Sequence, residues 1–156
     1  MLSADAGRCA RDDPAPMPRA RRIVVGYDGS ATARRALDLA AERAEGGTLY
    51  IVYAYDLPGP MKGGVAYDRV VGQHKQVGQD VLAGLPELPG VTVERELLGD
   101  HPAVAIANVA EVREADEIVV GSRGFSSLRG ALGSTSHELL HRAHCPVTVV
   151  PAQPGE

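Results

Sequence analysis

The residues with the clearest chemical potential lie in a glycine-rich stretch, residues 121–136, that follows a short apolar run. Gly121 and Gly124 carry no Cβ atom, so backbone amides there can approach a bulky anion closely. Arg123 and Arg129 place two cations in the same stretch, as a polyphosphate requires in a chain of net charge −4. The stretch therefore predicts an anion site.

The end of this stretch has the spacing of a helix start. Thr135 and Glu138 are three positions apart, as in a capping box, which predicts a helix over about residues 135–143. The free N–H groups of Ser134, Thr135 and Ser136 would then point outward at the positive end of the helix dipole. Because such amides bind phosphate, phosphate is the expected ligand.

The spacing differs from the two best-known phosphate loops. Neither G-x-x-x-x-G-K-[ST] nor G-x-G-x-x-G occurs, because Gly121 and Gly124 are separated by two residues and no lysine follows. A carboxylate, Asp28, follows an earlier apolar run and precedes Gly29 and Ser30. Asp-Gly-Ser is also good turn chemistry, so Asp28 is either a helix-entry residue or a ligand-binding carboxylate.

Three histidines suggest a different chemistry. His137 and His141 match H-E-x-x-H on a predicted helix, and His144 follows, so a zinc protease has to be considered. The residues beyond His141 supply no well-placed third ligand other than His144. We interpret the three histidines as the half-exposed edge of a helix that can bind metal adventitiously. No G-x-S-x-G elbow occurs, so hydrolase chemistry of that type has no support.

Composition limits the class of protein. The 156 residues are 44% hydrophobic and 23% charged, as in one globular domain with one core. Aromatic residues make up 4%, tryptophan is absent and the pI is near 5.7, which argues against nucleic-acid binding. Cys9 and Cys145 form no C-x-x-C pair, and no apolar run has the length of a membrane span. We expect a cytoplasmic protein that contacts neither nucleic acid nor membrane.

Short apolar runs alternate with helical patterns along the chain. The predicted strands are residues 23–27, 49–55, 91–98, 118–120 and 147–150. Ser30 is a plausible N-cap for the first helix, and Pro102 suits the first turn of the third. The second helix rests on a stripe of Val70, Val77, Val81 and Leu82, which Gly72 and Gly78 weaken.

This alternation predicts one open parallel sheet of five strands with helices on both faces, a Rossmann-like α/β fold. If strands two and three lie on one side of strand one, and strands four and five on the other, the strand order reverses between strands one and four. Asp28 and Gly121 follow the carboxyl ends of those two strands. A crevice at this switch point would contain both residues.

Asp28, the Gly121-x-x-Gly124 spacing and the pair Gly133-Ser134 resemble the ATP-binding form of the universal stress protein family, over about residues 22–151. The resemblance implies an adenine nucleotide alpha hydrolase-like fold that binds ATP, with Mg²⁺. By resemblance Asp28 contacts the base or ribose, the backbone of Ala54 faces the adenine edge, and Arg123 contacts phosphate or ribose. The phosphates would be held by Gly121, Gly124, Gly133, Ser134 and Thr135.

One departure from the family is the spacer between its second and third glycines. Relatives usually have nine residues there, and residues 125–132 are eight. The spacer favours an alternative, a nucleotide-free dimeric interaction module of the same fold, whereas the retained glycines oppose it. A slow ATPase is a further alternative, and a dedicated enzyme is not expected.

The resemblance also implies an assembly and a function. Relatives pair the last strand, here residues 147–150, antiparallel across a two-fold axis, so we expect a homodimer. The expected function is nucleotide-dependent stress response or signalling. Residues 1–20 are predicted to be a disordered extension, residues 21–152 the domain, and residues 153–156 a tail.

Overall fold

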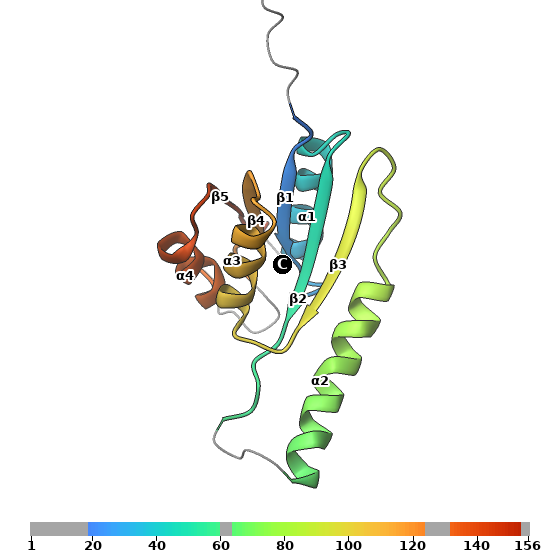
Figure 1. Ribbon diagram of the computed structural model, residues 1–156, viewed down its shortest axis with the longest axis vertical. Helices are drawn as coiled ribbons and strands as arrows, with labels where there is room; N and C mark the ends of the chain where they lie inside the picture. Colours follow the sequence, from blue (N-terminus) through green and yellow to red (C-terminus); the bar gives the residue numbers. More distant parts are fainter. Residues whose placement is uncertain (1–18, 60–63, 124–131, 154–156) are drawn as a thin grey trace, which may run out of the picture.

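Five parallel strands form one open sheet in the order β3-β2-β1-β4-β5 (Figure 1). The structure is a computed structural model that describes residues 19–59, 64–123 and 132–153. The strands are β1 (Arg22–Gly26), β2 (Thr48–Ala54), β3 (Thr92–Leu98), β4 (Glu117–Gly121) and β5 (Val147–Val150). The order reverses between β1 and β4, which confirms the predicted parallel sheet and its switch point.

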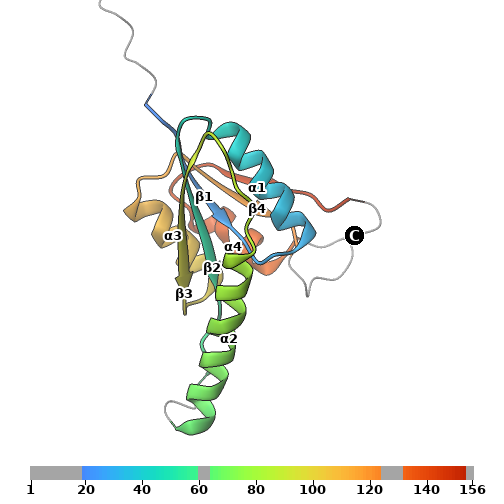
Figure 2. The same ribbon diagram turned by 90° about the vertical axis from the view of Figure 1, so that its right-hand side faces the viewer.

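Four helices connect the strands. They are α1 (Ala31–Arg43), α2 (Val65–Ala83), α3 (Pro102–Val112) and α4 (Ser134–Arg142). Helices α1 and α2 lie on one face of the sheet, and α3 and α4 lie on the other (Figures 1 and 2). Among the described residues, no helix combines the length and the apolar character needed to cross a membrane.

Each face of the sheet has its own hydrophobic core. Alternate side chains of a strand point to opposite faces, so Ile23 and Val25 of β1 pack with Leu37 of α1. Val24, between them, packs on the other face with Ile106 of α3. Because β1, β2 and β4 are covered on both sides, their sequences are nearly continuous apolar runs.

The predicted helix starts at Ser30 and Pro102 are confirmed. The hydroxyl oxygen of Ser30 accepts a hydrogen bond from the amide of Ala33 at 3.2 Å, which caps α1. Pro102 occupies the first turn of α3, where its missing N–H has no intrahelical role. The Ser30 cap and the first-turn Pro102 mark where α1 and α3 begin at the carboxyl edge of the sheet.

The predicted apolar stripe of the second helix is wrong at two positions. Val70 and Val77 are 37% and 52% exposed. Leu82 is buried, and Val81 packs partly against the core. Only the end of α2 that includes these two residues packs against the sheet, and Figure 1 shows the rest of the helix extending beyond it.

Gly78 has a packing role that the sequence did not predict. An added Cβ atom there would lie 2.4 Å from Cδ1 of Leu97 and 2.7 Å from Cδ1 of Tyr53. The glycine therefore lets α2 lie directly against β2 and β3. Gly72 has no neighbouring atom within 4 Å, so it retains the ordinary cost of glycine in a helix, about 1 kcal/mol.

Ion pairs link neighbouring elements at the amino ends of β1 and β4. Glu117, only 5% exposed, accepts hydrogen bonds from Arg21 at 3.2 Å, from the hydroxyl of Thr148 at 2.6 Å and from Arg43. Further pairs at this end join Arg19 to Asp116 and Arg22 to Glu114. The buried carboxylate of Glu117 therefore has the charged partners that burial requires.

Candidate functional site

A cleft of about 370 Å³ lies at the carboxyl ends of β1 and β4, at the predicted switch point. Every predicted site residue that the structure describes lines it: Asp28, Ala54, Gly121, Arg123, Gly133, Ser134 and Thr135. Gly124 and Arg129 lie outside the described residues. The strand ends and the start of α4 thus bring together residues up to 107 positions apart in the chain (135 − 28).

Asp28 has the structural role that its sequence also allowed. Its Oδ1 atom accepts a hydrogen bond from the amide of Ser30 at 2.9 Å, an Asx turn that leads into α1. No hydrogen bond from the described residues reaches its second carboxylate oxygen. Burial, and to a lesser degree the charge of Asp28, raises the pKa of Tyr53 above its ordinary value.

Gly121 also has a packing role that the sequence did not predict. A Cβ atom there would lie 2.5 Å from the hydroxyl oxygen of Thr32 and 2.9 Å from its carbonyl carbon. The start of α1 occupies the space into which a side chain at position 121 would project. The hydroxyl of Thr32 also donates to the carbonyl of Arg123. This contact joins α1 to the end of β4 and gives the cleft a fixed wall.

The predicted capping box at the start of α4 does not form. The N-cap residue is Gly133, one position before the helix, and no side chain caps the first turn. Glu138 instead accepts hydrogen bonds from Arg142 at 2.8 and 3.1 Å. The hydroxyl of Ser136 donates to the carbonyl of Gly121 at 2.7 Å and fixes α4 against β4. The positive end of α4 therefore borders the cleft without a side-chain cap.

One predicted amide is already engaged. The N–H of Gly133 donates to the carbonyl of Ser122 at 2.7 Å. Gly133 lines the cleft, but its amide is not available in this conformation. The amides left for an anion at this helix start are those of residues 134–136.

The charges in the cleft have no ionic partners within the described part of the chain. The guanidinium of Arg123 makes no hydrogen bond or ion pair there, and neither does the carboxylate of Asp56. The sequence interpretation missed Asp56, although it follows the second strand just as Asp28 follows the first. Charges of both signs are therefore available to a ligand in this cleft.

An apolar wall completes the cleft. Val52 of β2 and Ile106 of α3 line it, next to the backbone of Ala54. Gly26 allows this approach of α3, because a Cβ atom there would lie 2.7 Å from Cδ1 of Ile106. Apolar walls with a few polar groups are the usual composition of small-ligand sites.

The histidines of the H-E-x-x-H motif do not converge on one point. The rings of His137 and His141 meet edge to face with centroids 5.1 Å apart. His144 lies 3.9 Å from a carboxylate oxygen of Glu111 on α3. Within the described residues, no three His, Cys, Asp or Glu side chains are grouped to hold a metal ion.

Known proteins resemble this chain over most of its length. The family model described as the universal stress protein family matches residues 19–151. A universal stress protein from Thermus aquaticus is 34% identical over 134 residues, which cover 83% of this chain and 98% of the relative. One from Methanocaldococcus jannaschii is also 34% identical, over 140 residues that cover 83% of this chain and 81% of the relative.

Solved structures are similar as well. A universal stress protein from Lactobacillus plantarum has 27% identity and a TM-score of 0.61, and the match covers 85% of this chain and 98% of that one. A universal stress protein in complex with cAMP has 26% identity and a TM-score of 0.55, with 85% and 97% covered. One from Archaeoglobus fulgidus in complex with dAMP has 26% identity and a TM-score of 0.55, with 83% and 97% covered.

Proposed function

The chain belongs to the universal stress protein family, and on this premise we propose that it binds ATP, with Mg²⁺, in the cleft at the carboxyl ends of β1 and β4. The observation that carries the proposal is the first turn of α4, which borders this cleft with no side-chain cap and stands beside the unpaired Arg123. A phosphate group supplies both the acceptor and the charge that these donors lack.

The residues of the cleft divide between the two ends of a nucleotide. The amides of Ser134 and Thr135, together with Arg123, face the phosphates. The carboxylate of Asp28 accepts from a ribose hydroxyl or an amino group of the base, and the apolar wall that includes Ile106 packs against the base. The similar proteins solved with cAMP and with dAMP support an adenine nucleotide as the ligand.

The role of Mg²⁺ follows from the charges of the cleft. Its described residues include two carboxylates, Asp28 and Asp56, but one guanidinium, Arg123. A free triphosphate would be repelled by the carboxylates, and Mg²⁺ would reduce that repulsion. Mg²⁺ takes oxygen ligands and commonly uses one or two carboxylates together with substrate phosphates, which fits this set of donors. We expect Mg²⁺ to strengthen ATP binding more than AMP binding.

We further propose that the protein forms a homodimer and acts in stress response or signalling. Partner proteins would distinguish the nucleotide-bound from the nucleotide-free dimer. Strand β5 supports this part of the proposal, because it lies at an edge of the sheet and pairs with β4 alone among the described strands. A second copy would pair along residues 147–150. The free thiol of Cys145 supports the further proposal of a reducing, cytoplasmic location.

Titration calorimetry with ATP, with and without Mg²⁺, tests the ligand. We expect Arg123→Gln to weaken ATP binding by about tenfold, the effect of one charge-assisted contact. The matched control is Arg34→Gln, at an exposed position of α1 outside the cleft, which should leave the affinity unchanged. Absence of binding at millimolar ATP–Mg²⁺, or equal losses in the two variants, would refute the proposal.

The nucleotide-free interaction module remains the second candidate, favoured by the amide of Gly133, which is already engaged by Ser122. Freshly purified protein distinguishes the two candidates. An ATP binder carries adenine nucleotide or gains melting temperature when ATP is added, because a ligand that binds the folded state stabilises it. A protein that does neither, yet remains dimeric in light scattering, is the interaction module.

A further inference from the structure

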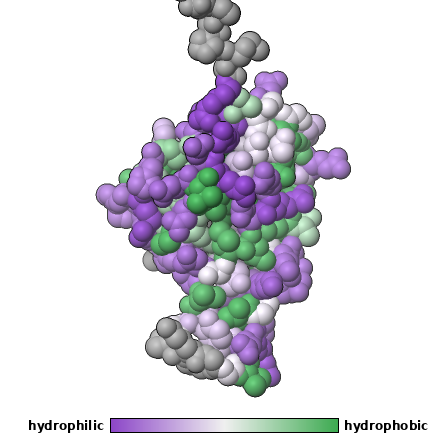
Figure 3. Space-filling model, in the orientation of Figure 1, coloured by the Kyte–Doolittle hydropathy of each residue, from purple (hydrophilic) through white to green (hydrophobic). Residues whose placement is uncertain are grey.

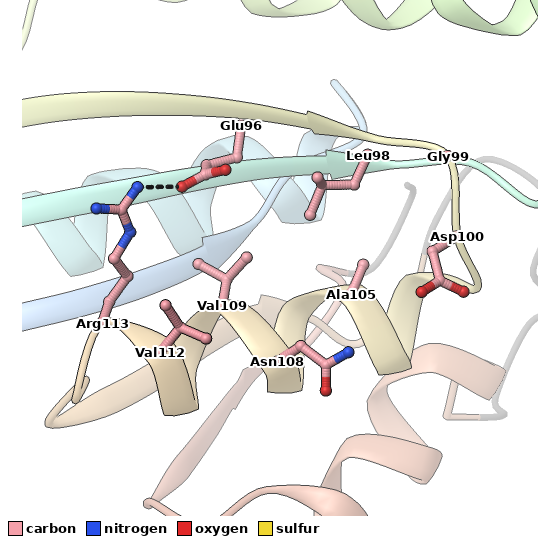
Figure 4. Close-up of a pocket in the computed structure, with 9 residues that line it drawn as sticks. All are labelled: Glu96, Leu98, Gly99, Asp100, Ala105, Asn108, Val109, Val112 and Arg113. Carbon is pink, nitrogen blue, oxygen red and sulfur yellow. Dashed lines mark hydrogen bonds and ion pairs between the residues drawn. The ribbon is translucent and has the colours of Figure 1, made fainter.

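A second hollow, separate from the cleft, lies between β3 and α3 (Figure 4). Helix α3 packs on β1 and β2, and β3 is the edge strand beyond them. The face of β3 that points toward α3 therefore forms the floor of a groove, and α3 forms its wall. The groove has a volume of about 450 Å³, within the range of small-molecule sites and too small for a docked domain.

The middle of the groove is apolar. Figure 4 shows Leu98 pointing from β3 toward α3, and Ala105 and Val109 pointing back toward the strand. Val112 is 79% exposed. Figure 3 shows hydrophobic surface gathered in the middle of this face, with hydrophilic surface around it. An apolar chain in the groove would cover this surface and gain the corresponding burial energy.

One end of the groove already holds a cation of the chain itself. The guanidinium of Arg113 lies over the ring of Tyr50, 5.0 Å from its centroid. It donates to Oε1 of Glu96 at 2.7 Å and lies 3.4 Å from Oε2 of Glu94. The hydrogen bond to Glu96 is the main cause that raises the pKa of Arg113 above its ordinary value. This end is therefore suited to cations and retains one excess carboxylate.

The other end has a carboxylate without a cation. Asp100 accepts a hydrogen bond from the amide of His101 at 2.7 Å and forms no ion pair with any described residue. Asn108, midway along α3, also lines the groove and is exposed. Asp100 follows Glu96 by four positions, about 13 Å along an extended chain. The groove thus has negative charge at both ends and an apolar middle.

We propose that this groove binds a linear aliphatic polyamine. Its methylene segments would lie on Leu98 and Val109, and its terminal ammonium groups would lie near Glu96 and Asp100. The carboxylates of Glu94, Glu96 and Asp100 would repel an anion, because among the described residues only Arg113 pairs with any of them. A flat aromatic ligand has no ring to stack on, because Arg113 covers Tyr50. A metal ion alone would leave the apolar middle uncovered.

Spermidine titrated into the nucleotide-free protein at low salt tests the proposal. The main variant is Val112→Lys, which puts a competing ammonium group in the groove at an exposed position and so should preserve the fold. Its matched control is Val65→Lys, the same substitution at a 78% exposed position on α2. We expect Val112→Lys to weaken spermidine binding by at least about fivefold and Val65→Lys to leave it unchanged.

A second pair of variants tests the carboxylate end of the groove. Asp100→Asn should weaken spermidine binding by about fivefold, whereas Glu87→Asn, at an exposed position outside the groove, should not. Hexylamine, with one ammonium group, should bind more weakly than spermidine. Equal binding by all variants would show unspecific attraction to an acidic protein and overturn the proposal. Displacement of spermidine by equimolar Mg²⁺ alone, or binding of basic peptides without binding of spermidine, would also overturn it.

Discussion

Charged side chains are paired at one end of the sheet and unpaired at the other, among the described residues. At the amino ends of β1 and β4, arginines are paired with carboxylates, and the buried Glu117 takes two of them. At the carboxyl ends, Asp28, Asp56 and Arg123 form no ion pair with any described residue, and the first turn of α4 has no side-chain cap. The paired charges hold the strands and helices together, whereas the unpaired charges border a cleft. The difference supports the proposal that the carboxyl end of the sheet holds the ligand.

An open helix start has a cost in stability. Replacing a good N-cap residue by alanine typically lowers stability by about 1 kcal/mol, whereas glycine at this position lowers it by only about a few tenths of a kcal/mol. Proteins commonly keep such departures from local optimisation at functional sites. The following changes test whether the carboxyl end is shaped for binding and the amino end for stability.

The largest expected effect is that of Gly121→Val. Because a Cβ atom meets the hydroxyl and backbone of Thr32, the start of α1 must shift, which should lower the free energy of unfolding by about 3 kcal/mol. Nucleotide binding should be lost together with stability. Gly72→Ala, where no atom lies within 4 Å, is the control and should raise the free energy of unfolding by about 1 kcal/mol. Urea unfolding measures both, and an unaffected Gly121→Val protein would contradict the packing described here.

Glu117→Gln tests the amino end. It removes the buried charge that Arg21 and Arg43 share, and should lower the free energy of unfolding by about 2 kcal/mol, since both arginines are partly solvated. ATP affinity should stay within about twofold, because the cleft lies at the opposite end of the strands. The control, Glu114→Gln, removes a 78% exposed carboxylate and should cost under about 0.5 kcal/mol. A tenfold loss of ATP affinity in Glu117→Gln would break the division between the two ends.

Gly133→Asp should separate stability from binding. The N-cap has extended dihedrals, φ −62° and ψ 151°, that suit an aspartate whose side chain caps the first turn of α4. We expect a gain of a few tenths of a kcal/mol in stability and a loss of about tenfold in ATP affinity, because the carboxylate occupies the amides and repels phosphate. Gly133→Asn, a cap without charge, should give a smaller loss. Unchanged ATP affinity in both variants would mean that α4 does not hold the phosphates.

The smallest effect concerns Cys145, beside the amino-end charges. Burial first, and then Asp116 and Glu117, raise the pKa of this thiol. At pH values between the ordinary and the raised pKa, the thiol is therefore neutral in the folded protein and ionised in the unfolded chain. This contribution to stability is complete below the ordinary cysteine pKa of about 8.5 and is lost as the pH rises through the raised value. The stability difference between the parent protein and Cys145→Ala should shrink from pH 7 to pH 10, and a constant difference would refute the assignment.

Features that depend on local sequence were predictable. The apolar runs specify the strands, and the helix starts at Ser30 and Pro102 follow from residue types near them. Asp28 and Gly121 were placed together because parallel strands end at one edge of the sheet. Asp56 carried the same signal as Asp28 and was overlooked.

Features that depend on packing between distant elements were not predictable. The glycines at 78 and 121 are explained by side chains of Leu97 and Thr32, which local patterns cannot place. The capping box does not form because the N-cap is Gly133, two positions before Thr135, which leaves Glu138 free to pair with Arg142. The groove between β3 and α3 exists because α3 packs on β1 and β2, and no motif in the sequence indicates it.

The most direct test of the central claim is a crystal structure of the protein with ATP and Mg²⁺. We expect phosphate oxygens about 3 Å from amide nitrogens of residues 134–136, and the carboxylate of Asp28 beside the ribose or the base. A cleft that remains empty at saturating ATP, or a nucleotide bound away from the start of α4, would contradict it.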